Sequence, residues 1–256
     1  MATDRINGSL YTKIENGIAF VEFGHPASNS FVSELLERLA KEFHTLSENK
    51  EVSVIVLKSE GDRAFCAGAS FDELVAIQDL EQGKAFFSGF ANVINAMRVC
   101  TKPIVGRVQG KAVGGGVGLA ASCDYVYATE AASIKLSEIS IGIAPLVIAP
   151  AVERKIGKSG LAELSLNPTE WKNAYWAKEK GLFSKVFDSI AEMDKELDFH
   201  IQRLATYNPE ALAEMKRVLW EGTDHWEHLL LERAEASGRL ALSPNTKKAL
   251  EKFKKN

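Results

Sequence analysis

The chain has 256 residues, of which 46% are apolar and 25% are charged, and its formal net charge is −3. This length can bury one large core with a smaller appendage, and the charge balance gives no reason to expect nucleic acid or an anionic membrane as a partner. The three cysteines, Cys66, Cys100 and Cys123, show neither CxxC nor Cys/His spacing, so we expect no disulfide framework and no metal site. The N-terminus lacks a signal-peptide pattern and no apolar run approaches the roughly 18 residues of a membrane span, so we expect a cytoplasmic protein.

A predicted hairpin opens the chain. Segments 10–14 and 18–23 flank Asn16-Gly17, the dipeptide that suits a two-residue turn. Apolar residues at helical spacing then predict an amphipathic helix over 32–47. The β-branched run 52–57 is typical of a buried parallel strand. Ser70 followed by Glu73 fits a capping box, so a helix should begin at about residue 71.

Strands and helices continue to alternate through the middle of the chain. We predict a helix over 81–99 and strands over 104–108, 124–128 and 134–136, and these repeated units indicate an α/β core. From about residue 193 the pattern is helical only, with Asn208-Pro209 and Ser243-Pro244 as helix starts. We therefore divide the chain into a core over 1–195 and a helical region over 196–256. The apolar surface of segment 225–242 predicts a subunit interface.

Two strand-to-helix corners and one acid form the candidate site. Gly114-Gly115-Gly116 lets backbone N–H groups approach a ligand closely, with the positive end of a helix dipole behind them. A second corner, about 45 residues upstream, places the N–H of Ala69 at a helix start. Glu138 follows the glycines by about 20 residues, in apolar surroundings that would raise the pKa of its carboxyl. This combination suits the stabilisation of an enolate-like oxyanion while a proton moves.

The same residues allow other interpretations. The glycines alone could form a tight junction without a ligand, and Glu138 alone could be a solvated loop carboxylate. A dinucleotide-binding GxGxxG frame fails, because its third small position falls on Leu119 and no acidic partner stands at the expected distance. A serine protease on a related spiral would need a histidine near Ser70, and none is suitably placed.

Five motifs, in this order and spacing, resemble the crotonase (enoyl-CoA hydratase/isomerase) superfamily. They are Phe65-Cys66-Ala67-Gly68-Ala69, Gly114-Gly115-Gly116, Cys123-Asp124, Leu136-Ser137-Glu138 and Ile141-Gly142-Ile143-Ala144-Pro145. The resemblance runs from about residue 10 to 255. It implies a crotonase-type spiral of ββα units with a C-terminal helical trimerisation region, assembled as a homotrimer or as a hexamer of two trimers. It also implies an acyl-CoA thioester substrate, with CoA arriving as part of that substrate and with no metal or bound cofactor.

The resemblance also assigns roles to residues. It puts the two oxyanion-hole N–H groups on Ala69 and Gly115 and the acid/base on Glu138. The residues that would line the substrate site around them are Ala67, Gly68, Gly114, Gly118 and Leu146. Leu146 stands where dienoyl-CoA isomerases and chlorobenzoyl-CoA dehalogenases carry an aspartate, so we do not expect those two activities.

One departure from the family pattern bears on the reaction. Typical hydratases carry two glutamates, and the first would fall on Gly118. The remaining carboxylate suits a Δ3,Δ2-enoyl-CoA isomerase, because a single base can move a proton between Cα and Cγ. Residues 136–150 nevertheless look like the 3-methylglutaconyl-CoA hydratases of bacterial leucine breakdown, in which the first glutamate is also often missing. We therefore predict a 2-enoyl-CoA hydratase, with the isomerase as alternative and a non-catalytic acyl-CoA-binding protein as a third hypothesis.

Cations outside these motifs could contact the rest of the substrate. Lys111, just before the glycines, is either a surface lysine or a partner for the free carboxylate of a dicarboxylyl-CoA. Arg63 and the C-terminal lysines Lys252, Lys254 and Lys255 are candidates for binding the CoA phosphates.

Overall fold

The computed structural model describes residues 6–253, and within this range the strands form two sheets. The larger sheet has six strands in the order β1-β2-β3-β4-β6-β9, and the smaller has the order β5-β7-β8. The strands are β1 Ser9–Glu15, β2 Ile18–Gly24, β3 Val54–Ser59, β4 Ile104–Val108, β5 Ala112–Val113, β6 Tyr125–Thr129, β7 Ser133–Lys135, β8 Lys172–Asn173 and β9 Lys185–Phe187. In the larger sheet, β1 pairs with β2 in antiparallel fashion and the other neighbours are parallel.

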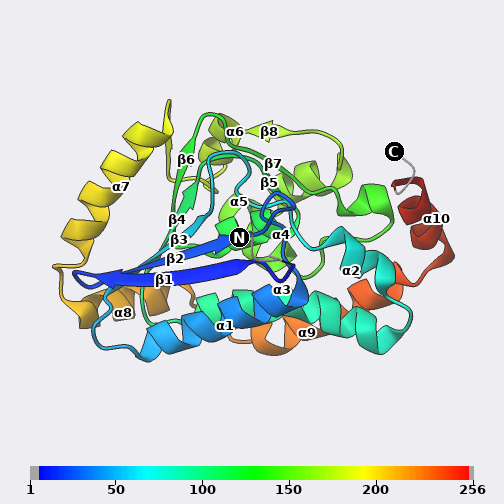
Figure 1. Ribbon diagram of the computed structural model, residues 1–256, viewed down its shortest axis with the longest axis horizontal. Coiled ribbons are helices and arrows are strands. Elements are labelled where there is room, and N and C mark those ends of the chain that lie inside the picture. Colours follow the sequence, from blue (N-terminus) through cyan, green and yellow to red (C-terminus); the bar gives the residue numbers. More distant parts are fainter. Residues whose placement is uncertain (1–5, 254–256) are drawn as a thin grey trace.

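Helices follow most of these strands (Figure 1). They are α1 Ser33–Glu48, α2 Phe71–Ala76, α3 Leu80–Val99, α4 Gly115–Ser122, α5 Ala149–Leu166, α6 Ala174–Glu179, α7 Ile190–Leu204, α8 Pro209–Leu219, α9 Trp226–Ala241 and α10 Pro244–Phe253, with a short 3-10 helix, η1, at Glu138–Ile141. No helix of the described part is long and apolar enough to cross a membrane.

Local sequence signals account for the turn between β1 and β2 and for the start of helix α2. Asn16 and Gly17 both have positive φ, 50° and 79°, and form the tight turn between β1 and β2. The Ser70 hydroxyl accepts a hydrogen bond from the Glu73 N–H, and α2 begins at Phe71 as predicted. The Glu73 carboxylate does not complete the capping box, because it accepts from the Ser33 N–H and hydroxyl instead.

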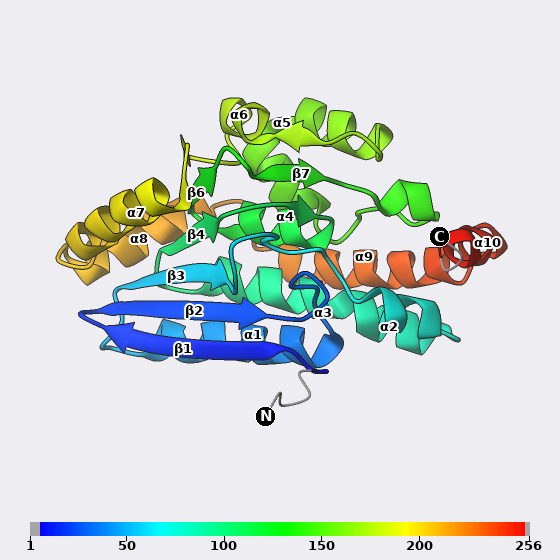
Figure 2. The ribbon, with the colours of Figure 1, turned by 45° about the horizontal axis from the view of Figure 1, so that its top comes forward.

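The inner strands β2, β3, β4 and β6 of the larger sheet are mostly buried, which explains their nearly continuous apolar sequences, whereas the edge strand β1 is largely exposed. Alternate residues of β3 point to opposite sides. Ile55 and Leu57 join the core formed with α1 and α3, whereas Val54 and Val56 pack against α7. Figure 2 shows α1 and α3 along one side of the strands, with α9 beside α3.

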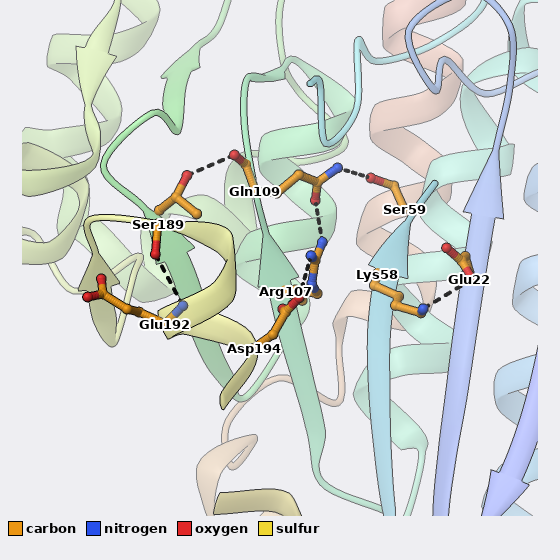
Figure 3. Close-up of polar contacts among 9 residues, drawn as sticks. Glu22, Lys58, Ser59, Arg107, Gln109, Ser189, Glu192 and Asp194 are labelled. Atoms are coloured by element: carbon orange, nitrogen blue, oxygen red, sulfur yellow. Dashed lines mark hydrogen bonds and ion pairs between the residues drawn. The ribbon is translucent and has the colours of Figure 1, made fainter. Parts of the chain in front are cut away.

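Polar contacts attach α7 to one face of the larger sheet. Arg107 on β4 donates two hydrogen bonds to the Asp194 carboxylate of α7, at 2.6 and 2.9 Å (Figure 3). Gln109, just beyond β4, donates to the Ser59 hydroxyl at 2.9 Å. A paired guanidinium and carboxylate of this geometry fixes orientation as well as position. The boundary that we predicted after residue 195 therefore falls inside a helix, α7, that packs on the core.

The last helices pack tightly against the core. A β-carbon built on Gly238 of α9 would lie 2.9 Å from the Gly83 carbonyl carbon of α3, so only glycine permits this approach. Trp226 and Leu230 of α9 are buried in the core, Leu229 and Leu231 are partly buried against it, and Leu240 is exposed. The α8 helix is anchored by Lys216, whose ammonium is 2.7 Å from the Asp124 carboxylate; that carboxylate also accepts from Trp220.

Candidate active site

Pairing between two extended segments brings the two corners together. The carbonyl of Lys111 accepts from the N–H groups of Phe65 and Cys66, and the Cys66 carbonyl accepts from Val113 at 2.9 Å. Both segments then turn into helices at neighbouring points. A β-carbon on Gly68 would lie 3.6 Å from the Gly115 nitrogen, so the Ala69 and Gly115 corners are adjacent.

The N–H groups at both corners are available. The Gly68 carbonyl accepts from the Phe31 N–H, and the Ser70 N–H donates to the Phe31 carbonyl. The Ala69 N–H between them has no hydrogen-bond partner among residues 6–253. Gly115 is the first residue of α4, where backbone N–H groups have no partner within the helix, and its N–H likewise has none in the described chain.

Glu138 lies directly over the glycine corner. Gly114 has φ +52°, and a β-carbon there would come within 2.8 Å of Glu138 Oε1, so the absence of a side chain makes room for the carboxyl. Glu138 opens the 3-10 helix η1, and its carbonyl accepts from the Ile143 N–H at 3.1 Å. The buried Thr246 of α10 donates to the Gly142 carbonyl at 2.6 Å and holds this loop from outside.

A cavity of about 260 Å³ joins these elements. It contains Ala67, Gly68, Ala69, Gly114, Gly115, Glu138 and Leu146 of the predicted site residues. Its other walls are largely apolar and aromatic, including Phe86, Phe87 and Phe90 of α3. Such a cavity is small for a binding site, since pockets for drug-sized molecules are about 300–1,000 Å³.

Burial changes the chemistry of the Glu138 carboxyl. The residue as a whole is half-buried, but its Oε2 atom is buried and has no hydrogen-bond partner in the described chain. Removal from water disfavours the charged form and raises the pKa of Glu138 from 4.5 to about 7. The carboxyl can therefore both accept and donate a proton near neutral pH.

The place of a second carboxylate is occupied by an apolar side chain. Gly118 is buried within α4 and does not line the cavity. A β-carbon built on it would lie 2.5 Å from Cγ2 of Ile148, and Ile148 is itself part of the cavity wall. Among the residues lining the cavity, Glu138 is the one with a titratable side chain.

The predicted cations lie elsewhere. Arg63 and Lys111 line a second hollow of about 610 Å³ together with His25 and Asp62. Lys111 points over the ring of Trp171, with its nitrogen 4.9 Å from the ring centroid. The structure thus does not bring Arg63, Lys111 or Gly118 into the Glu138 cavity. Lys252 is on α10, while Lys254 and Lys255 lie outside the described residues.

Sequence reasoning missed three residues around the site. Ile148 fills the space next to Gly118, Thr246 anchors the Glu138 loop, and Ser237 of α9 lines the cavity. Ile148 was visible as part of an apolar run near the proline at 150. The other two carry no local signal, because they reach the site only through the packing of α9 and α10.

Comparison with known proteins agrees with this geometry. Residues 13–252 match the family described as enoyl-CoA hydratase/isomerase. The chain is 30% identical to the mitochondrial methylglutaconyl-CoA hydratase of Mus musculus over 77% of this chain and 63% of that protein. It is 28% identical to the peroxisomal Delta(3,5)-Delta(2,4)-dienoyl-CoA isomerase of Arabidopsis thaliana over 75% of this chain and 72% of that protein. The crystal structure of an enoyl-CoA hydratase from Bacillus halodurans superimposes with a TM-score of 0.88 at 20% identity, covering 95% of this chain and 99% of that one.

The fold is thus that of the crotonase superfamily, as the motifs predicted. The chain belongs to the enoyl-CoA hydratase/isomerase family, and it is an enzyme of the hydratase or isomerase type. The assembly into trimers or hexamers stays a prediction.

Proposed function

We propose that this enzyme is a Δ3,Δ2-enoyl-CoA isomerase that uses Glu138 as its single acid/base. The observation that carries the proposal is the composition of the cavity: one carboxyl with a raised pKa, and Ile148 in the space that a second carboxylate would need. This proposal puts the isomerase before the hydratase, whereas the sequence favoured the hydratase. Hydration requires both activation of water and protonation of Cα, and two groups can share these tasks more readily than one group can perform both.

The positions of the groups support the following reaction. Ionised Glu138 removes a proton from Cα of a 3-enoyl thioester, and the electron pair moves onto the thioester oxygen. The N–H groups of Ala69 and Gly115 would hold that oxygen, assisted by the N-terminal dipole of α4. Protonated Glu138 then returns the proton to Cγ, which moves the double bond into conjugation with the carbonyl. The thioester itself delocalises the charge, so we propose that CoA is needed only as part of the substrate.

A hydratase is the second candidate, and similarity to relatives favours it. The mouse methylglutaconyl-CoA hydratase is 30% identical to this chain. Glu138 would then have to activate the water and protonate Cα in turn. A carboxylated acyl chain fits this cavity less well, since no lysine, arginine or histidine lines it and a buried carboxylate would lack a partner.

We also propose that the second hollow receives the phosphates of CoA. Arg63 and Lys111 are the cations that line it, and Arg63 is exposed to solvent. Arg63→Ala should then raise KM for acyl-CoA substrates and leave kcat unchanged, whereas an unchanged KM would remove Arg63 from the CoA site.

Ultraviolet absorbance of the conjugated enoyl thioester separates the candidates. We expect absorbance to rise with 3-hexenoyl-CoA and to stay constant with crotonyl-CoA and 3-methylglutaconyl-CoA. Falling absorbance with either conjugated substrate would make the enzyme a hydratase. No change with any of the three would favour a non-catalytic acyl-CoA-binding protein.

A further inference from the structure

The wall of the cavity contains a polar group that the proposed reaction does not use. Ser237 of α9 is 1% exposed and lines the cavity, and its hydroxyl has no hydrogen-bond partner in the described chain. A helical serine ordinarily satisfies its hydroxyl with the carbonyl four residues earlier. Ser122 of α4 does so, donating to Gly118 O at 2.8 Å. Ser237 does not, and an unsatisfied buried hydroxyl costs stability unless a ligand completes it.

Close packing on both sides fixes the position of this hydroxyl. The next residue, Gly238, touches Gly83 of α3 so closely that neither helix can shift toward the other. Arg233, one turn earlier on the same face of α9, donates to the Leu146 carbonyl at 3.2 Å and ties the helix to the cavity loop. Ser237 is therefore held rigidly between α3 and that loop.

The hydroxyl lies away from the reacting end of the cavity. Phe90 of α3 abuts Gly115, and Gly83 of the same helix abuts Gly238. Seven helical residues separate these two contacts, a span of roughly 10 Å. A thioester carbonyl at the Gly115 N–H would thus direct its acyl chain along α3, past Phe86 and Phe87, toward Ser237.

The chemistry of the wall selects the kind of group that Ser237 can meet. Apart from Ser137 and Glu138, the other lining residues have apolar side chains or none. A charged substituent would find no counter-ion, whereas a hydroxyl can both donate to and accept from an uncharged oxygen.

From these contacts we infer that Ser237 is a specificity-determining residue that binds an uncharged oxygen, a keto or hydroxyl group, several carbons beyond the thioester of a short acyl chain. The inference deepens the proposed function, because it names the substrate class of the same cavity. The reaction at Cα and Cγ is otherwise unaffected by it.

Saturated thioesters test this recognition without turnover. Calorimetry would compare hexanoyl-CoA with 5-oxohexanoyl-CoA, heptanoyl-CoA with 6-oxoheptanoyl-CoA, and both oxo compounds with adipoyl-CoA. We expect at least one oxo thioester to bind roughly tenfold more tightly than its plain counterpart. Ser237→Ala should abolish this gain and change binding of the plain thioesters less than about twofold.

Ser165→Ala is the matched control, since Ser165 is also a helical serine with an unpartnered buried hydroxyl but does not line the cavity. This variant should still bind the oxo thioester more tightly than the plain one. The inference is overturned if neither oxo compound gains affinity, if the gain survives in Ser237→Ala, or if adipoyl-CoA binds most tightly.

Turnover of 3-hexenoyl-CoA is measured separately. If oxo thioesters bind more tightly through Ser237 but the protein does not isomerise 3-hexenoyl-CoA, the role of Ser237 is upheld and the isomerase proposal is refuted. If the protein isomerises 3-hexenoyl-CoA but oxo thioesters bind no more tightly than plain ones, the isomerase proposal is upheld and the role of Ser237 is refuted.

Discussion

The carboxyl of Glu138 makes stability depend on pH in an unusual direction. Below its ordinary pKa of 4.5 it is protonated in both the folded and the unfolded chain. Between pH 4.5 and about 7 the unfolded chain loses this proton and the folded chain keeps it, so this contribution to stability falls as pH rises. Above pH 7 the loss is complete and amounts to about 3 kcal/mol.

Glu138→Gln should remove this dependence. We expect the variant to match the wild type near pH 4 and to be more stable at pH 8, with the difference developing between these values. Urea unfolding at a series of pH values measures it. A difference that is constant with pH would mean that the carboxyl is already ionised in the folded protein at pH 5.

Gly118 and Ile148 together exclude a second carboxylate. Gly118→Glu alone should destabilise the protein by about 1–3 kcal/mol, because its β-carbon overlaps Ile148. Combined with Ile148→Gly, which removes both atoms that lie closer than 3 Å and leaves Cα of residue 148 at 3.8 Å, it should fit and present a second acid to the cavity. We expect the double variant to hydrate crotonyl-CoA at least tenfold faster than either single variant, because general acid/base catalysis typically raises a rate by at least this much. Equal hydration by all three proteins would refute the steric explanation.

A hydrogen bond from Thr246 of α10 helps to hold the loop that carries Glu138. Thr246→Val removes the donor to Gly142 O and leaves that carbonyl unpartnered, at a cost of about 1–3 kcal/mol. Because the loop carries Glu138, we expect kcat for 3-hexenoyl-CoA to fall roughly tenfold, consistent with the sensitivity of catalysis to small displacements.

Thr129→Val provides the comparison for this variant. Its buried hydroxyl donates to Gln109 O, which is outside the Glu138 cavity. The two variants should lose similar stability by thermal unfolding, and the Thr129 variant should retain the wild-type kcat. A similar fall of kcat in both would show that Thr246 acts only through global stability.

For the whole molecule, α8 offers an apolar surface that the subunit does not cover. Met215, Val218 and Leu219 share one face of the helix and are 50%, 45% and 46% exposed. Of the apolar residues of α9 on which we based the predicted interface, Trp226 and Leu230 are buried within the subunit, whereas Leu240 is exposed, so an α9 contact between subunits stays a prediction. We predict a homotrimer or hexamer whose contacts include this α8 face.

Light scattering checks the assembly. Val218→Glu should shift the mass toward that of the monomer, because a charge in an apolar contact is costly. Tyr11→Glu, at an exposed apolar residue of β1, should leave the mass unchanged. A monomeric wild-type protein would contradict the predicted assembly.

Local sequence signals were sufficient for much of the fold. The Asn16-Gly17 turn, the Ser70 cap and helices α1 and α3 lie where predicted, although β3 begins two residues later than the apolar run suggested. The cavity brings Ala69, Gly115 and Glu138 together, as their motifs indicated. Lys111 could not be placed, because its direction depends on Trp171, 60 residues away along the chain. Ser237 and Thr246 could not be found, since periodicity identifies the face of a helix but not its neighbour.

Turnover of 3-hexenoyl-CoA by Glu138→Gln tests whether Glu138 moves the proton. The amide fills the same volume but cannot accept a proton from Cα. We predict that kcat falls at least about a hundredfold, while hexanoyl-CoA binds within about threefold of the wild type. A variant that retains more than a tenth of the wild-type kcat would show that another group moves the proton, and the single-carboxyl account would be wrong.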